Sequence, residues 1–192
     1  MPSPPDRLDD LAADVLARLR HAAEARTGAW RTPMLATVAA DGAPSLRTVI
    51  LRGVEAAGRT LTLYTDRRSD KAAQIAREAK VELGFWDPEA GQQLRVAGIA
   101  RVAVDGPAVE RGWQALPAQA RAIYLGATAP GTPLGRPGSS GIAVPDPRRE
   151  VFAVIDVVWA RWDWLWLGPD GHRRARAEWE ADGSVRWAWV EP

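Results

Sequence analysis

The chain has 192 residues, no cysteine and a formal net charge of +1. These values exclude disulfides, thiolate metal sites and a cysteine nucleophile, and they give no global electrostatic reason to bind nucleic acid or an anionic membrane. The apolar content of 46% is typical of a globular protein of one domain, expected over residues 1–192. Two histidines make a His-rich metal site unexpected. Because no signal peptide or run of about 20 apolar residues is present, we expect a soluble, cytoplasmic protein.

The hydrophobic pattern predicts one long helix followed by many short strands. Leu8, Leu11, Val15 and Leu19 recur at helical spacing, which indicates a helix over about residues 6–27. Asp41-Gly42 is a strong hairpin signal, and residues 53–58 are expected to form a loop. The strands predicted in chain order cover residues 34–39, 45–51, 60–65, 81–86, 93–104, 151–159, 162–167, 172–179 and 184–190.

Two further helices and one long loop complete this prediction. Ser69 is a candidate N-cap for a helix over residues 70–79, and a second helix is expected over about 107–119. Gly and Pro dominate residues 126–147, which indicates a long surface loop. Since most strands are joined by short turns, the predicted fold is mainly β with flanking helices, an antiparallel barrel or sandwich.

The segment from Tyr64 to Lys71 is a candidate phosphate site. Here a predicted strand runs into a turn and then a helix, so free helix N–H groups, hydroxyls and cations converge. Lys71 adds a point charge, and Arg67 or Arg68 could add a forked guanidinium. An ordinary capped helix with a solvated basic turn explains the same residues about equally well.

Arg47 and Arg52 flank the apolar positions of one predicted strand. Being five residues apart, they point to opposite faces of a regular strand, so one ligand meets both only if the strand twists, bulges or lies at a subunit boundary. Gln93 and Arg95 share one face of another predicted strand, where Gln93 could pair with an amide-like ring. Taken alone, each pair also fits ordinary exposed strand positions.

The C-terminal part of the chain is rich in tryptophan. Seven of the ten tryptophans lie from Trp159 onward, and Trp162, Trp164 and Trp166 alternate onto one face. Core or interface packing is the favoured interpretation of these rings. The alternative is stacking with single-stranded nucleic acid, aided by the neighbouring arginines, but the acidic residues of the segment and the low net charge weigh against it.

Taken in order, four segments resemble the pyridoxamine 5'-phosphate oxidase family of FMN-binding split β-barrels. The family pattern R-x-V-x-L-[KR], Y-T-x-x-x-S-x-K, V-x-L-x-F-x-W and Q-[VL]-x-V-x-G is matched by Arg47–Arg52, Tyr64–Lys71, Val81–Trp86 and Gln93–Gly98. The resemblance covers about fifty residues at its core. It is closer to the oxidase-related FMN-binding subgroup than to the genuine oxidase, and it implies an antiparallel split β-barrel.

The resemblance implies FMN bound at a homodimer interface. In such proteins Arg47, Ser69 and Lys71 would hold the phosphate. The other residues that would meet the flavin are Val49 and Leu51 through their backbone, Arg52, Tyr64, Thr65 and Gln93 at the ring or its polar edge, and Trp166 and Arg176 from the partner subunit. No metal is implied.

Departures from the family pattern concern the phosphate and the substrate. Asp70 replaces an arginine of the usual S-R-K, and Arg67 or Arg68 is the candidate to compensate. Trp113 and Pro117 fall where the oxidase carries groups for its substrate's phosphate, and residues 172–174 read H-R-R instead of R-L-H. We therefore expect an FMN-dependent oxidoreductase of unassigned small-molecule substrate. The alternative is a flavin-binding or flavin-storage module without turnover.

Overall fold

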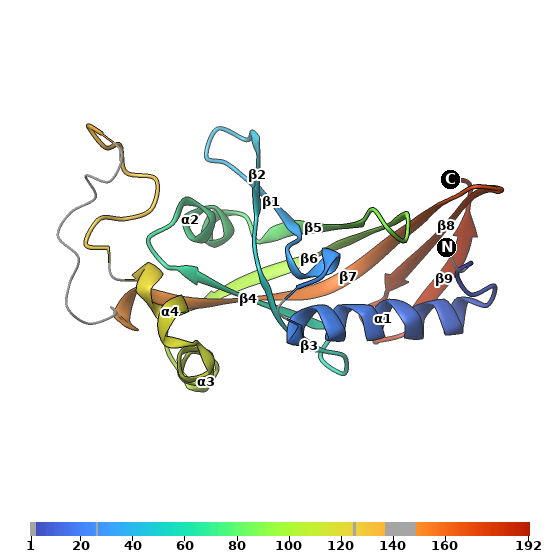
Figure 1. Ribbon diagram of the computed structural model, residues 1–192, viewed down its shortest axis with the longest axis horizontal. Coiled ribbons are helices and arrows are strands. Elements are labelled where there is room, and N and C mark those ends of the chain that lie inside the picture. Colours follow the sequence, from blue (N-terminus) through green and yellow to red (C-terminus); the bar gives the residue numbers. More distant parts are fainter. Residues whose placement is uncertain (1–2, 26, 125, 137–148) are drawn as a thin grey trace.

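The computed structural model describes residues 3–25, 27–124, 126–136 and 149–192 (Figure 1). Within these residues the strands are β1 (Met34–Val38), β2 (Pro44–Thr48), β3 (Leu51–Glu55), β4 (Thr60–Asp66), β5 (Lys80–Asp87), β6 (Gln92–Ala103), β7 (Phe152–Gly168), β8 (Gly171–Trp179) and β9 (Val185–Val190). The α-helices are α1 (Leu8–Glu24), α2 (Asp70–Arg77), α3 (Pro107–Ala115) and α4 (Ala118–Arg121). Short 3-10 helices cover Ala29–Arg31, Ala122–Tyr124 and Arg149–Val151.

The long strand β7 organises one antiparallel sheet in the order β2-β1-β5-β6-β7-β4-β3. β6 pairs along one edge of β7, while the other edge is shared, first by β4 and then by β8, which also pairs with β9. The two ends of the order, β2 and β3, do not pair, so the sheet is not closed. This confirms the predicted mainly β, antiparallel fold with flanking helices.

A β-bulge marks the place where β7 changes partner. The register between β6 and β7 shifts at Gly98, where Ala97 faces Arg161 but Gly98 faces Trp159. A side chain at Gly98 would overlap the carbonyl oxygen of Val158 and lie 2.9 Å from the Cα of Trp159. Glycine is therefore required by the close approach of the two strands.

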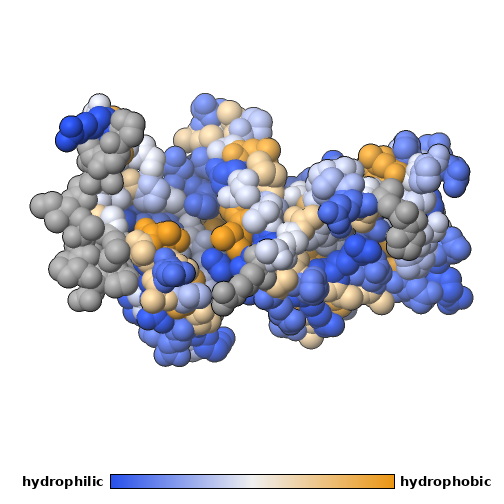
Figure 2. Space-filling view, viewed as in Figure 1, coloured by the Kyte–Doolittle hydropathy of each residue, from blue (hydrophilic) through white to orange (hydrophobic). Residues whose placement is uncertain are grey.

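Helix α1 covers the inner face of the sheet. Leu11, Val15 and Leu19 are fully buried in the main core cluster, and the helix packs against β3 and β9. Its other side is mostly hydrophilic (Figure 2). An amphipathic helix of this kind is stabilised mainly by burying its apolar stripe.

The tryptophans of β7 belong to the same core. Trp162, Trp164 and Trp166 are all at most 7% exposed. Trp159 joins them on this face because of the bulge, with its ring centroid 5.2 Å from that of Trp162. The prediction that these rings serve core packing is confirmed.

A second, smaller core lies between β4, β7 and α3. Phe152 is in edge contact with Tyr64 and Tyr124, with centroids 5.1 and 5.3 Å apart. Gly112 of α3 lets the helix approach, since a side chain there would lie 3.1 Å from the Tyr64 ring. This packing holds α3 against the outer face of the sheet.

Several predicted boundaries are wrong. A single strand over residues 45–51 is replaced by β2 and β3 with a break at Val49 and Ile50, and the loop predicted over 53–58 begins as strand. The two strands predicted over 151–159 and 162–167 are one strand, β7. The helix predicted over 107–119 divides into α3 and α4. Residues 126–136 of the predicted loop contain no helix or strand, while residues 137–148 lie outside the described part.

Candidate flavin site

Arg47 lies where β2 meets α2. Its guanidinium donates to the carbonyl oxygens of Leu35 at 3.2 Å and Ser45 at 2.9 Å, and to Gln74 Oε1 of α2 at 2.8 Å. Burial lowers the pKa of Arg47, and Asp70 partly offsets this. The side chain is thereby fixed beside the first turns of α2.

Lys71 and Ser69 join Arg47 at the start of α2. Burial, followed by the charge of Arg47, lowers the pKa of Lys71, so two cations share a partly desolvated place. No acid of the described residues forms an ion pair with Lys71. Such a place suits an anionic group, which would relieve the repulsion and accept from Lys71, while both terminal nitrogens of Arg47 already donate within the protein.

Ser69 occupies the predicted N-cap position but makes no side-chain cap hydrogen bond. Its hydroxyl donates to the carbonyl oxygen of Asp66 at 2.7 Å and lies 3.1 Å from the hydroxyl of Thr65. Both Ser69 and Thr65 are 4% exposed. The two hydroxyls therefore pack under the turn that precedes α2.

The two arginines of that turn, Arg67 and Arg68, differ in the contacts that they make. Arg68 pairs with the carboxylate of Asp66 at 2.6 Å and donates to the carbonyl oxygens of Gly126 and Ala127. Its hydrogen bond with Asp66 raises the pKa of Arg68. Arg67 is exposed, so Arg67 is the less committed of the two candidates to replace the missing phosphate cation.

Arg52 lies on the other side of the strand break, at a bulge between Leu51 and Gly53. Its guanidinium lies 5.4 Å from the centroid of the Tyr64 ring, and its buried Nε has no hydrogen-bond partner in the part of the chain that the structure describes. Burial, then the charge of Arg31, lowers the pKa of Arg52. An unpaired buried donor of this kind is costly in isolation and favours a ligand acceptor.

Arg52 and Tyr64 line an open cavity of about 460 Å³ beneath α3. The volume lies within the roughly 300–1,000 Å³ range of small-molecule sites. Asp156 also lines the cavity and accepts from the Thr62 hydroxyl at 2.7 Å. Val49 and Leu51, expected to contribute backbone contacts, are buried in the main core between Arg47 and Arg52.

Gln93, Trp166 and Arg176 lie far from this group. Gln93 pairs with Leu165 and Tyr64 with Val154, so they are separated by 11 residues along β7. At about 3.3 Å per residue this is roughly 35 Å, longer than one flavin mononucleotide can bridge. Figure 1 shows the β5–β6 turn, next to Gln93, well away from α2 along the sheet.

Trp166 and Arg176 point to opposite faces of the sheet. Arg176 pairs in register with Asp163, three residues from Trp166, and side chains alternate along a strand. Trp166 is 7% exposed within the inner core, whereas Arg176 lies on the outer face with Gln93. The structure therefore brings Gln93 and Arg176 to one surface and leaves Trp166 behind it.

Asp163 is a residue that the sequence reasoning missed. It is 2% exposed and accepts hydrogen bonds from Arg95, Arg174 and Arg176 at 2.8–3.0 Å. Burial opposes its ionisation, but these hydrogen bonds outweigh that effect and lower the pKa of Asp163 to about 2. An acid in alternation with tryptophans was the available signal, although sequence alone does not show which arginines face it.

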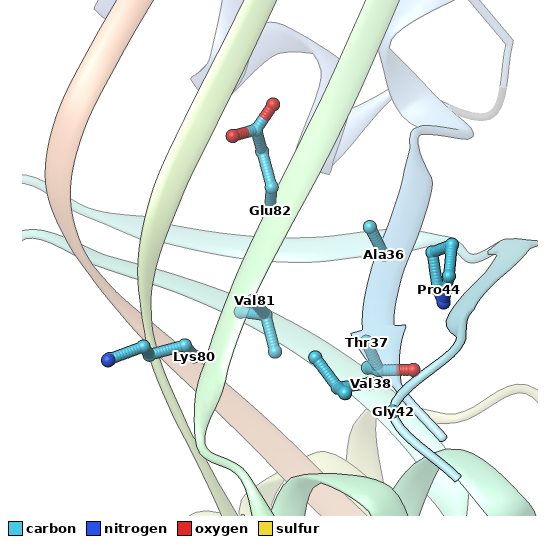
Figure 3. Close-up of a pocket in the computed structure, with 8 residues that line it drawn as sticks. All are labelled: Ala36, Thr37, Val38, Gly42, Pro44, Lys80, Val81 and Glu82. Carbon is cyan, nitrogen blue, oxygen red and sulfur yellow. The ribbon is translucent and has the colours of Figure 1, made fainter.

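A second open cavity, of about 310 Å³, lies between β1, β2 and β5 (Figure 3). Figure 3 shows Lys80 and Glu82 extending from β5 and the mostly apolar side chains of β1 and β2 beside them. None of the predicted flavin residues lines it. The described residues also contain no group of three or more His, Cys, Asp or Glu suited to a metal ion.

Comparison with known proteins agrees with a flavin site. Residues 14–104 match the family described as pyridoxamine 5'-phosphate oxidase, FMN-binding domain. This match covers a little under half of the chain and confirms the expected resemblance to an FMN-binding domain. Trp166 and Arg176 lie beyond the matched residues. Arg47, Ser69 and Lys71 lie together at the start of α2, the place expected for the phosphate.

Individual relatives and solved structures extend the likeness. The chain is 38% identical over 102 residues to pyridoxine/pyridoxamine 5'-phosphate oxidase of Chromobacterium violaceum, and 34% over 108 residues to that of Anaeromyxobacter dehalogenans. These matches cover 53% and 56% of this chain and 47% and 54% of the relatives, so the chain spans about half the length of these curated relatives.

Two solved structures share the fold over nearly the whole chain. A pyridoxamine 5'-phosphate oxidase-related, FMN binding protein from Nostoc punctiforme has a TM-score of 0.78 at 25% identity and covers 100% of both chains. PhzG from Burkholderia lata has a TM-score of 0.75 at 20% identity and covers 99% of this chain and 95% of its own. The open antiparallel sheet is thus the split-barrel fold of this family.

Proposed function

We propose that this chain is a homodimeric FMN-binding flavoprotein and an oxidoreductase acting on an unassigned small molecule. The observation that carries the proposal is the convergence of Arg47, Ser69 and Lys71 at the start of α2. Two cations with lowered pKa, and no acid among the described residues paired to Lys71, suit the dianionic phosphate of FMN. We also propose that residues 1–192 form one domain and that the protein is cytoplasmic.

A dimer would reconcile the two separated groups of predicted flavin residues. One subunit would supply the group around α2, and the partner would supply Gln93 and Arg176. The outer face that bears Gln93 also exposes large apolar side chains that share this face by strand register. They are 37–61% exposed: Met34, Leu46, Trp86, Ile99, Val158 and Leu167. Such a surface suits a self-complementary contact between two copies.

The cavity under α3 suits the reacting end of the flavin and a small substrate. FMN supplies two-electron chemistry when bound, while the protein orients the reactants and sets the charge around the ring. Arg52 would hold positive charge at the polar edge of the ring, and Tyr64 would keep that guanidinium in place through the ring contact. α3 would limit the access of water to the cavity.

The packing of α3 argues against pyridoxine phosphate as the substrate. Trp113, which replaces a phosphate-binding group of the oxidase, packs on Tyr124 and Phe152 with centroids 5.8 and 5.5 Å apart. Pro117 lies at the start of α4 and has no donor to offer. Trp113 packs against the second core and Pro117 is exposed, so neither position offers a hydroxyl or a cation to a phosphate.

The decisive experiment is the spectrum of the purified protein. We expect a yellow chromophore with flavin absorption bands, released on denaturation and identified as FMN by mass spectrometry, or stoichiometric FMN uptake by the apoprotein. Protein that neither carries nor takes up FMN would contradict the proposal. Anaerobic titration with nicotinamide cofactors and pyridoxine phosphate would then identify a donor.

The second candidate is a flavin-binding or flavin-storage module without turnover. It is favoured by the replacement of the substrate-phosphate positions by core packing at Trp113. Bound FMN whose spectrum no reductant or substrate changes at useful rates would support this candidate against the oxidoreductase.

A further inference from the structure

Asp163 holds three arginines together on the outer face of the sheet. Arg95 comes from β6, and Arg174 and Arg176 come from β8, so the carboxylate ties both strands that flank β7. Arg174 donates twice, through Nε at 2.9 Å and Nη2 at 2.8 Å, while Arg176 donates through Nε at 3.0 Å. The contact of Arg174 is the forked type that fixes orientation as well as distance.

The arginines keep unused donors that face outward. Their side chains are 23–45% exposed, although Asp163 itself is buried. Arg95 also pairs with Glu82 at 3.6 Å, and Glu82 pairs with Arg161 at 3.6 Å. Four guanidiniums and two carboxylates leave an excess of two positive charges on this face. Arg176 bonds Asp163 through Nε alone, which leaves its two terminal nitrogens available to an acceptor above the sheet.

We infer that Asp163 is a positioning residue, which orients Arg174 and Arg176 toward the flavin bound largely by the partner subunit. This inference rests on the proposed function. Arg176 is one of the residues implied to meet the flavin, and Gln93 lies on the same face, where its strand partner Leu165 also pairs with Arg174. Without the shared carboxylate, three neighbouring guanidiniums would repel one another and separate.

An orienting role of Asp163 and a simple effect of net charge predict opposite changes in FMN affinity. Asp163→Asn keeps the size of the side chain but removes one negative charge. If only net charge mattered, the more positive face would bind anionic FMN more tightly. If orientation matters, the arginines lose their common acceptor and FMN affinity falls, by roughly tenfold, the effect of about one charge-assisted hydrogen bond.

The test measures FMN dissociation by quenching of flavin fluorescence, together with the visible spectrum of bound FMN and the melting temperature of the apoprotein. We expect Asp163→Asn and Arg176→Lys each to weaken FMN binding about tenfold and to shift the flavin bands. Arg176→Lys preserves charge on a partly exposed side chain, so it keeps the test valid should Asp163→Asn fold poorly. Glu178→Gln is the matched control, since Glu178 pairs with Arg186 outside the cluster.

The outcomes separate this inference from the proposed function. Failure of the unaltered protein to bind FMN would contradict the proposed function itself. Normal binding by that protein, with unchanged or tighter FMN binding and an unshifted spectrum in Arg176→Lys and in folded Asp163→Asn, would overturn the positioning role alone. A melting temperature lowered in the apoprotein without any change in FMN affinity would likewise make Asp163 purely structural.

Discussion

At the residue scale, Lys71 offers a direct test of the phosphate site. Burial and the nearby Arg47 lower the pKa of Lys71. A bound phosphate would therefore stabilise the charged forms of both Lys71 and Arg47. We expect Lys71→Gln to weaken FMN binding at least about tenfold, the loss of one charge-assisted contact. Fluorescence titration of the apoprotein with FMN measures this effect.

The chain provides its own matched control. Lys80 is the other of its two lysines, and it lies exposed at the start of β5, beyond the C-terminal end of α2. Lys80→Gln changes net charge by the same amount and should leave FMN affinity unchanged. Equal losses in both variants would show a general charge effect and contradict a specific phosphate contact.

The lowered pKa of Asp163 predicts that part of the unfolding free energy is lost in acid. Its folded pKa of about 2 lies below the model-peptide value of 3.8, so the folded state binds this proton less readily than the unfolded state. The stabilisation is therefore present above about pH 4 and is lost as pH falls through about 2. It amounts to about 2 kcal/mol of unfolding free energy.

Denaturant unfolding at several pH values between 2 and 6 would measure this component. Asp163→Asn should flatten the acid limb of the stability curve relative to the unaltered protein. Parallel curves for the two proteins would contradict the lowered pKa. Glu178→Gln again serves as the control, because Glu178 is about half exposed in its pair with Arg186.

The sequence predicts candidate residues for the site, but it does not show which partners each of them contacts. Order and spacing predicted Arg47, Ser69 and Lys71, and the fold brings them to one place because β2 and α2 meet there. Asp163 escaped prediction because its role depends on two strand registers, which bring Arg95 and Arg176 beside it. Hydrophobic pattern and turn geometry set the register of a strand pair, but the sequence around Asp163 does not show which strands pair with β7.

At the element scale, the bulge in β7 predicts a severe effect of a small substitution. Gly98→Ala would place a methyl group against the carbonyl oxygen of Val158 and 2.9 Å from the Cα of Trp159. We expect a loss of about 1–3 kcal/mol in unfolding free energy, with a melting temperature lower by about 2–4 °C per kcal/mol. Thermal unfolding followed by circular dichroism measures it.

Gly84 in β5 supplies the comparison, since a side chain there would meet nothing within 4 Å. Gly84→Ala should therefore be neutral or slightly stabilising, because alanine restricts the unfolded chain more than glycine does. Similar losses in Gly84→Ala and Gly98→Ala would contradict the steric explanation.

The same bulge explains why the sequence pattern predicts two strands where the structure has one, β7. The extra residue near Ala160 changes the alternation of buried positions, from Val157 and Trp159 to Trp162 and Trp164. A break in period 2 usually indicates a strand end, whereas here β6 pairs across it without interruption. Strand existence was therefore predictable from alternation, while strand continuity depended on a partner distant in sequence.

At the scale of the whole molecule, the resemblance already implies two groups of flavin residues, with Trp166 and Arg176 supplied by the partner subunit. Family resemblance assigned Gln93 to the same subunit as Arg52 and Tyr64. The pairing of β4 and β6 with distant parts of β7 separates them by roughly 35 Å. A two-fold dimer in which each chain contributes one group to each of two sites would bring them together.

Subunit mixing tests this arrangement directly. Lys71→Gln removes a residue of the α2 group, and Arg176→Ala removes one of the β8 group, so each variant alone should bind FMN weakly. In a mixed dimer one site would carry both substitutions and the other neither. Random reassembly should therefore restore normal FMN affinity in about a quarter of the sites.

The control mixture combines Lys71→Gln with Ser69→Ala, because both residues belong to the α2 group and no mixed dimer then contains an intact site. FMN titration of each mixture, with dimer formation followed by analytical ultracentrifugation, gives the readout. Recovery in the first mixture alone would demonstrate that two subunits complete each site. If exchanging dimers show no recovery in either mixture, Arg176 and Lys71 do not serve a common site across the interface, because every mixed dimer would have contained one unaltered pair.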